Sequence, residues 1–294
     1  MGNLSIRLSK KSATTVGFGA VLLWALLAFL TVGSDPVPPF LLNALCFAIG
    51  GLVGLVWTMA SGGLGQLRKV PLKVYAFGTL GLFGYHFLYF SALRLAPPAE
   101  ASLIAYLWPL LIVLLSGLLP GERLSLLHII GGLLGFAGAG LIVASGGHGF
   151  SSEYMAGYGL AFLCAFTWSS YSVVSRRFGA VPAASVTVFC IVTAILSVPA
   201  HLIWETTVWP VGVIAWGAVI GLGLGPVGLA FFVWDVGVKR GDIQLLGVAS
   251  YAAPVLSTFV LVLAGMAQFT VYLAGATVLI TLGALLASYA GARK

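Results

Sequence analysis

Long apolar runs separated by short polar segments occupy nearly the whole chain. An α-helix rises about 1.5 Å per residue, so about 20 apolar residues cross the ~30 Å hydrocarbon layer of a bilayer. Ten such runs are present, at approximately residues 13–32, 38–60, 72–93, 98–118, 125–145, 155–175, 182–204, 210–238, 243–264 and 269–290. The pattern predicts an all-α integral membrane protein with ten transmembrane helices and little room for a soluble domain.

Basic residues mark every second connection between these runs. Thirteen of the 14 Lys and Arg residues would face one side of the membrane, and Arg94 alone would face the other. The thirteen are Arg7, Lys10, Lys11, Arg68, Lys69, Lys73, Arg123, Arg176, Arg177, Lys239, Arg240, Arg293 and Lys294. Because basic loops stay on the cytoplasmic side, we expect both termini to be cytoplasmic.

Similar residues recur after about 145 positions, in the same order, through both halves of the chain. Pairs at an offset of 144 are Trp24 and Trp168, Pro38 and Pro182, Gly81 and Gly225, Gly84 and Gly228, and Phe87 and Phe231, and pairs at 145 are Tyr106 and Tyr251, Pro109 and Pro254, and Gly138 and Gly283. The change of offset indicates one insertion near residue 90. Five helices are an odd number, so residues 1–150 and 151–294 form two repeats of opposite orientation. Inverted repeats are typical of secondary transporters.

Two prolines lie in the middle of apolar runs. Pro109 and Pro254 each follow a tyrosine by three positions, in ASLIAYLWPLLIVL and GVASYAAPVLSTFV. Proline lacks the N–H for the helical hydrogen bond and crowds the carbonyl four residues earlier, so we expect both helices to bend there. The run 210–238 carries several glycines and Pro226, and predicts another kink.

Composition narrows the functional classes. Hydrophobic residues make up 60% of the chain and charged residues 7%, and the formal net charge is +7. The basic residues lie singly or in pairs at helix ends, which favours a role in topology over nucleic-acid binding. Cys46, Cys164 and Cys190 show no metal-type spacing, the four histidines are scattered, and no phosphate-binding loop is present. We expect no metal, no cofactor and no ATP-driven transport.

Aromatic residues at mid-membrane depth are the candidate binding residues. Membrane-anchoring Trp and Tyr belong at the interfaces, whereas several here fall near helix centres. They are Trp24, Tyr85, Tyr89, Tyr106, Trp108, Trp168 and Tyr251, with His86 between the first two of these tyrosines. Ordinary interhelical packing explains any one of them equally well. With no Lys or Arg at this depth, a pocket of these residues favours neutral or zwitterionic cargo. Asp235, four residues before Lys239, is better explained by an i,i+4 ion pair than by ion coupling.

The chain resembles the drug/metabolite transporter superfamily in its EamA-type ten-helix form, and within it the YddG-type aromatic amino-acid exporters. The resemblance covers essentially the whole chain. It rests on the 5+5 organisation, on FSALRLAPPAEASLIAYLWPLLIVLLS at residues 90–116 with GERLS following, on the mid-helix prolines and on His86 with its tyrosines. It implies export of amino acids across a bacterial inner membrane through a cavity between the halves. Ala253 stands where Trp108 would recur, so the implied pocket is carried by the first half.

Two other functions stay open at this point. One is export of drugs or other small neutral metabolites, and the other is a membrane-embedded enzyme acting on lipid-linked substrates. A carrier would exchange unmodified substrate, which an enzyme does not. We expect a monomer in the lipid bilayer, with a small-molecule substrate, an amino acid, as its partner.

Overall fold

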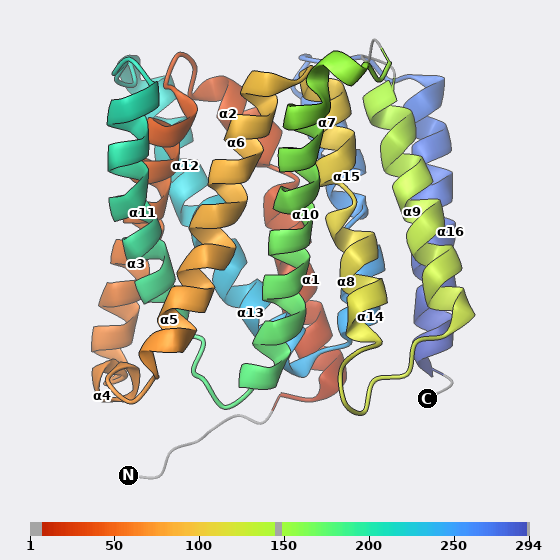
Figure 1. Cartoon of the computed structure of the whole chain (residues 1–294), viewed down its shortest axis with the longest axis horizontal. Helices are drawn as coiled ribbons and strands as arrows, with labels where there is room; N and C mark the ends of the chain where they lie inside the picture. The colour runs from red at the N-terminus through yellow and green to blue at the C-terminus, as the bar shows by residue number, and fades with distance from the viewer. Residues whose placement is uncertain (1–7, 145–148, 293–294) are drawn as a thin grey trace.

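The computed structural model describes residues 8–144 and 149–292, and this part of the chain is helical with no strand. Most helices stand side by side along one direction (Figure 1). The first half contains α1 (Lys10–Trp24), α2 (Leu27–Gly33), α3 (Pro39–Ala60), α4 (Leu64–Leu67), α5 (Leu72–Thr79), η1 (Leu80–Gly84), α6 (Tyr85–Leu95), α7 (Pro98–Ala105), α8 (Trp108–Ser116) and α9 (Leu126–Ala144). The second half contains η2 (Ser152–Tyr154), α10 (Met155–Ser175), η3 (Arg176–Phe178), α11 (Ser185–Trp204), α12 (Gly212–Leu224), η4 (Gly225–Leu229), α13 (Ala230–Arg240), α14 (Ile243–Ala249), α15 (Ala252–Leu263) and α16 (Val271–Ala292).

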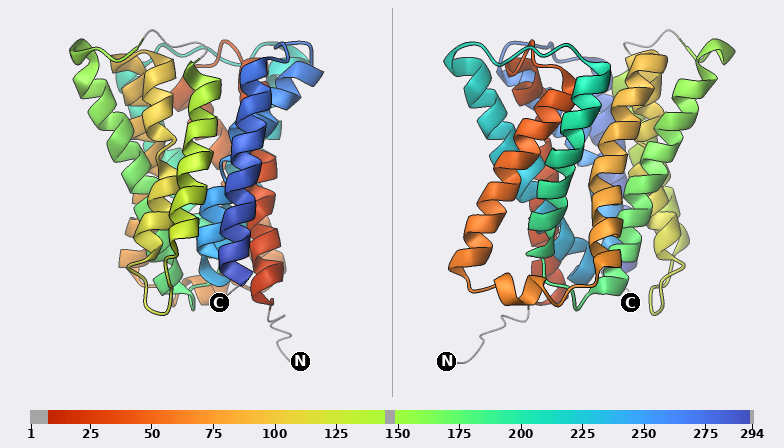
Figure 2. Two further views of the ribbon diagram at one scale, coloured as in Figure 1. Left: turned by 90° about the vertical axis from the view of Figure 1, so that its right-hand side faces the viewer. Right: turned by 60° about the vertical axis from the view of Figure 1, so that its left-hand side comes forward.

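Eight helical segments of the described chain are long and apolar enough to cross a membrane, which confirms an all-α integral membrane protein. They are Lys10–Gly33, Pro39–Ala60, Pro98–Ser116, Leu126–Val143, Ser185–Trp204, Gly212–Arg240, Ile243–Leu263 and Val271–Ala292. The remaining predicted runs, 72–93 and 155–175, are also helical, as α5–η1–α6 and as α10, and they run alongside the others (Figures 1 and 2). These two segments are less apolar than the other eight, because tyrosine, histidine, tryptophan and serine residues lower their mean hydropathy.

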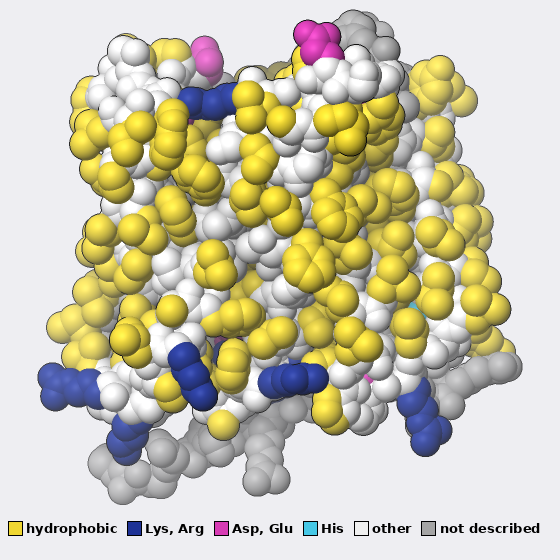
Figure 3. Space-filling model, viewed as in Figure 1, with side chains coloured by type: hydrophobic (Ala, Val, Ile, Leu, Met, Phe, Trp, Pro, Cys, Tyr) yellow, Lys and Arg dark blue, Asp and Glu magenta, His cyan; other side chains and the backbone are white. Residues whose placement is uncertain are grey.

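Charge separates the two ends of the helical bundle. Lys and Arg side chains gather along the lower edge of the molecule, and hydrophobic side chains cover the band above them (Figure 3). The start of α1 and the end of α16 lie at this lower end (Figure 1). We call it the basic end and the opposite one the acidic end.

Helix interruptions occur at matching places in the two halves. The π-helical turns η1 and η4 begin at residues 80 and 225, α6 and α13 at 85 and 230, and α7 and α14 at 98 and 243, each 145 residues apart. The expected break in the run 210–238 is present, because Gly225 leaves the helical conformation at φ −97° and ψ −94°. The starts of α9 and α16, at 126 and 271, have the same spacing, whereas those of α8 and α15, at 108 and 252, are 144 residues apart. A spacing of 145 already at residue 80 favours an insertion earlier than the sequence comparison indicated.

Glycines let the helices pack closely. A Cβ added at Gly17 of α1 would lie 2.7 Å from Cα of Gly237 in α13, and one at Gly131 of α9 would lie 2.6 Å from the carbonyl oxygen of Gly283 in α16. Real Cβ contacts of this length do not occur, so both pairs of helices require glycine at these positions.

Candidate functional site

Four tryptophans from four different helices meet in the middle of the bundle. Trp24 ends α1, Trp108 begins α8, Trp168 lies in α10 and Trp234 in α13. The ring centroids of all six pairs are 5.2–6.4 Å apart, mostly in edge-on or tilted arrangements. These four residues, which we call the tryptophan cluster, join both halves of the chain.

Irregular backbone and a buried serine satisfy two of the indole N–H groups. Nε1 of Trp24 donates to the carbonyl oxygen of Pro226 at 3.1 Å, and Nε1 of Trp234 donates to Oγ of Ser172 at 3.0 Å. Pro226 lies in the π-helical turn η4, where the regular backbone ladder is disturbed. The break in α12–α13 therefore fixes the orientation of Trp24.

His86 packs next to the cluster, among aromatic rings. Its imidazole makes edge-on contacts with Phe47 and Tyr85, at centroid distances of 5.0 and 5.1 Å, and with Phe231 at 6.1 Å. Nδ1 lies 2.7 Å from the carbonyl oxygen of Leu82. A carbonyl oxygen only accepts, so Nδ1 carries the proton, and Nε2 of the neutral ring is an acceptor.

Three tyrosines continue the site toward the acidic end. The rings of Tyr85 and Tyr89 are stacked at 6.1 Å, and Tyr85 also contacts Trp168 at 5.5 Å. The hydroxyl groups of Tyr89 and Ser102 are 3.2 Å apart, and the phenol of Tyr106 lies near those of Tyr85 and Tyr89. The three tyrosines are half-buried, whereas Trp108, Trp168 and Trp234 are buried.

Tyr251 occupies a different environment from the other candidates. It is fully buried in a hydrophobic cluster with Leu110, Ala139 and Val255. Its phenol oxygen accepts a hydrogen bond from the backbone N–H of Leu110 at 3.2 Å, and its ring lies against Gly135.

Both mid-helix prolines lie just after helix interruptions. The regular α-helical hydrogen bonding is interrupted by turns at Tyr106 and Leu107, before Pro109, and at Ser250 and Tyr251, before Pro254. The N–H groups of Leu107 and Tyr251 donate to the carbonyl oxygen three residues back instead of four. Leu110, which follows Pro109, donates its N–H group to Tyr251.

Sequence reasoning missed Trp234 and Phe231. Phe231 contacts Trp24, Trp168 and His86, and stacks on Phe47 at 5.5 Å. A signal was available, because an offset of 145 aligns Trp234 with Tyr89 and Phe231 with His86. The offset of 144 used for this segment aligned Phe231 with Phe87 instead.

Ion pairs lie at both ends of the bundle. At the basic end Nζ of Lys239 is 2.8 Å from Asp235 and donates to the carbonyl oxygen of Val181 at 3.1 Å, which confirms the expected i,i+4 pair. Arg176 pairs with Glu122 and donates to two carbonyl oxygens at the end of α13.

The acidic end is held by Glu205. Its side chain, 2% exposed, pairs with Arg94 at 3.0 Å and with Nδ1 of His201 at 2.8 Å. It also accepts the backbone N–H groups of Phe40 and Leu41 at the start of α3. Arg94, the one Lys or Arg of the described residues at this end, thus joins α6 to α3 and α11.

The described residues contain no group of three or more His, Cys, Asp or Glu side chains arranged to hold a metal ion. Cys46, Cys164 and Cys190 are buried and unpaired with one another.

Comparison with known proteins identifies the family. The model of the EamA-like transporter family matches this chain twice, over residues 11–144 and 155–289. The chain belongs to this family. The match confirms the expected resemblance and the transporter class.

Relatives of this EamA-like transporter cover nearly its whole length. It is 56% identical to the aromatic amino acid exporter YddG of Ancylobacter novellus, over 96% of this chain and 98% of the relative. It is 27% identical to the aromatic amino acid exporter YddG of Escherichia coli, over 85% of this chain and 88% of the relative. A solved crystal structure, 55% identical, has a TM-score of 0.92 and covers 96% of this chain and 98% of its own.

Proposed function

We propose that this EamA-like transporter exports aromatic and other large neutral amino acids from the cytoplasm. The tryptophan cluster is the observation that carries the proposal, because it gathers indole rings at mid-membrane depth, away from the interfaces that tryptophan prefers. A relative at 56% identity is named an aromatic amino acid exporter. All Lys and Arg side chains in the described residues belong to helix ends or loops, which favours a substrate without net charge.

The proposed architecture has ten transmembrane helices in two inverted repeats, residues 1–150 and 151–294. The double family match and the 145-residue spacing of the helix interruptions support this division. In this arrangement α5–η1–α6 and α10 cross the membrane with the eight more apolar segments. The basic end faces the cytoplasm, both termini lie there, and the protein is a monomer of the bacterial inner membrane.

The substrate binds between the tryptophan cluster and the three half-buried tyrosines. Its side chain packs against Trp24, Trp108 and Trp168, since aromatic pairs contribute about 0.5–1.5 kcal/mol beyond area burial. Nε2 of His86 accepts a hydrogen bond from the ammonium group. The hydroxyl groups of Tyr89 and Tyr106 donate to the carboxylate. This assignment leaves Tyr85 as a packing partner of Trp168 in the site.

Tyr251 has a supporting role in this proposal. The interruption before Pro109 leaves the backbone N–H of Leu110 without a helical acceptor, and the phenol oxygen of Tyr251 accepts its hydrogen bond instead. Tyr251 thereby stabilises the bend beside Trp108. A substrate contact is less compatible with its complete burial among aliphatic side chains.

In this proposal, the contacts at the basic end close the transporter toward the cytoplasm. Arg176 and Lys239 tie the cytoplasmic end of α13 to neighbouring segments, and Gly17 and Gly237 bring α1 and α13 together. When the contacts between the two halves break at one end and form at the other, the central site opens to the opposite side of the membrane. This is alternating access. The π-helical turns and the proline-associated breaks are the points where helices bend during the exchange.

Counterflow in proteoliposomes tests this function. Vesicles loaded with unlabelled tryptophan should accumulate labelled tryptophan, and Trp108→Ala should lower this rate about two- to ten-fold, from the aromatic contribution alone, while threonine counterflow changes less. The control is Trp209→Ala, since Trp209 is 55% exposed at the surface. Equal losses for both amino acids would indicate a packing role, and absence of aromatic counterflow in the wild type would refute the function.

A second variant tests the proposed hydrogen bond between Nε2 of His86 and the ammonium group of the substrate. His86→Phe keeps an aromatic ring among Phe47, Tyr85 and Phe231 but removes the Nε2 acceptor, and with it the Nδ1 donor to the carbonyl oxygen of Leu82. A lost hydrogen bond of about 1 kcal/mol weakens binding about five-fold, and here it should do so for tryptophan and threonine alike. Unchanged affinity would exclude His86 from the contact with the ammonium group.

A further inference from the structure

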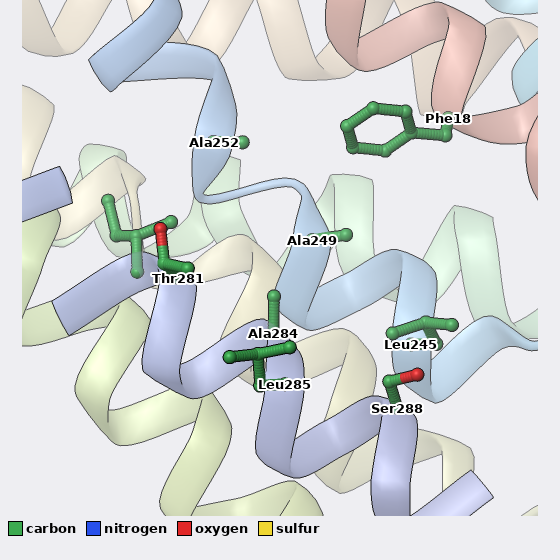
Figure 4. Close-up of a pocket in the computed structure, with 9 residues that line it drawn as sticks. Phe18, Leu245, Ala249, Ala252, Thr281, Ala284, Leu285 and Ser288 are labelled. Carbon is green, nitrogen blue, oxygen red and sulfur yellow. The ribbon is translucent and has the colours of Figure 1, made fainter. Parts of the chain in front are cut away.

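A furrow runs along the outside of the bundle between α1, α14, α15 and α16 (Figure 4). It consists of two adjoining grooves of about 350 and 220 Å³, which share Phe18, Leu245 and Ala249. The left view of Figure 2 shows α16 and α1 at the same side of the molecule. Its lining is mainly apolar, and its hydroxyl side chains are those of Thr14, Thr15, Thr281 and Ser288.

The length of the furrow along the helices is close to the thickness of one membrane leaflet. It begins near the basic end at Thr14 and Ser288 and reaches Ile280, eight residues back along α16. Eight helical residues span about 12 Å, close to half of the ~30 Å hydrocarbon layer. Leu285 at its wall is 61% exposed, so the furrow opens outward.

A lysine without a partner among the described residues stands at its basic end. Lys11 precedes Thr14, Thr15 and Phe18 by three, four and seven positions, so it shares their helix face. It is exposed, and no hydrogen bond or ion pair of its ammonium group occurs in the described structure. Its neighbour Lys10 is held differently, at 2.7 Å from Asp242. The ammonium of Lys11 is therefore available to an anion at the mouth of an apolar channel.

We propose that this furrow binds one phospholipid with an anionic headgroup, with an acyl chain along Phe18, Leu245 and Ala284 and the phosphate group against Lys11. The orientation proposed above assigns this lipid to the cytoplasmic leaflet. The far end of the chain contacts Ala249 and Ala252, which flank the helix interruption at Ser250 and Tyr251. A bound lipid thus stabilises the bent form of α14–α15.

Native mass spectrometry of the purified protein, titrated with phosphatidylglycerol or phosphatidylcholine, tests the site. The wild type should retain one phosphatidylglycerol in preference to phosphatidylcholine. Lys11→Gln should weaken phosphatidylglycerol binding about five-fold, as expected for one basic residue at an anionic lipid surface. The control is Lys69→Gln, because Lys69 is exposed at the same end but outside the furrow.

A larger side chain inside the furrow tests the acyl-chain contact independently of Lys11. Ala284→Phe should lower binding of both lipids, whereas Leu282→Phe, on an exposed face of α16 outside the furrow, should not. Equal retention of the two lipids by the wild type, or equal effects of Lys11→Gln and Lys69→Gln, would overturn the proposal. A dimer that forms in place of lipid retention would show that a second copy covers the furrow, and would also overturn it. None of these outcomes depends on which amino acid is transported.

Discussion

The phenol oxygen of Tyr251 accepts a hydrogen bond from the backbone N–H of Leu110 at 3.2 Å. This contact joins the interruption between α14 and α15 to the one between α7 and α8. A buried N–H group without a partner costs about 1–3 kcal/mol, so the helix break at Pro109 is tolerated because a side chain 141 positions away satisfies it. One repeat thereby stabilises the irregular backbone of the other.

Tyr251→Phe should lower the free energy of unfolding by about 1–3 kcal/mol, because the ring stays in place and only the acceptor is lost. The measurement is thermal or denaturant unfolding in detergent. Tyr272→Phe is the control, since Tyr272 is 51% exposed. Identical stabilities of the two variants would contradict the role of this hydrogen bond.

Glu205→Gln should destabilise the acidic end by about 3 kcal/mol, as expected when one member of a buried charged network is removed. Both carboxylate oxygens accept from donors, so an amide nitrogen in either position meets Arg94, His201 or the backbone N–H groups of α3. Unfolding measurements should show no comparable loss for Glu153→Gln, where the carboxylate is exposed. A loss below 0.5 kcal/mol, within the usual effect of surface substitutions, would disprove the network's importance.

Trp234→Phe should lower stability by at least about 1 kcal/mol, because it removes the hydrogen bond to Ser172 and leaves part of the volume of a fully buried indole ring empty, and it should also alter tryptophan counterflow. Ser172→Ala removes the same bond but leaves the indole ring in the tryptophan cluster. If Trp234 acts only through this bond, the two variants will transport alike. A larger transport defect for Trp234→Phe at matched stability would assign the ring itself to the site.

Membrane orientation can be checked with single cysteines and an impermeant thiol reagent. We expect Ser151→Cys to be labelled on whole cells and Ala292→Cys to be labelled only after the membrane is opened. The native background is low, because Cys46, Cys164 and Cys190 are buried. Labelling of Ala292→Cys on intact cells would reverse the proposed topology.

Local sequence features predicted much of the fold. Apolar length determined which segments form membrane-spanning helices, because transfer of a helix into hydrocarbon depends on its own composition. The charged residues separated the two ends, and Gly225 with Pro226 predicted the interruption in the run 210–238. The helical segments α5–η1–α6 and α10 are less apolar than the other eight spans. Their polar aromatic residues lower the mean hydropathy, and these residues pack inside the bundle.

The composition of the candidate site depended on the tertiary structure. Sequence analysis selected Trp24, Trp108 and Trp168 from their depth, and these do meet, but depth says nothing about the direction in which a helix faces. Trp234 completes the cluster, whereas Tyr251, at a similar depth, points toward Gly135 and Leu110. Helix rotation is decided by close approaches between distant segments, such as Gly17 with Gly237. The sequence alone therefore determined that aromatic residues lie near the centres of the apolar helices, and only helix packing decided which of them face one another.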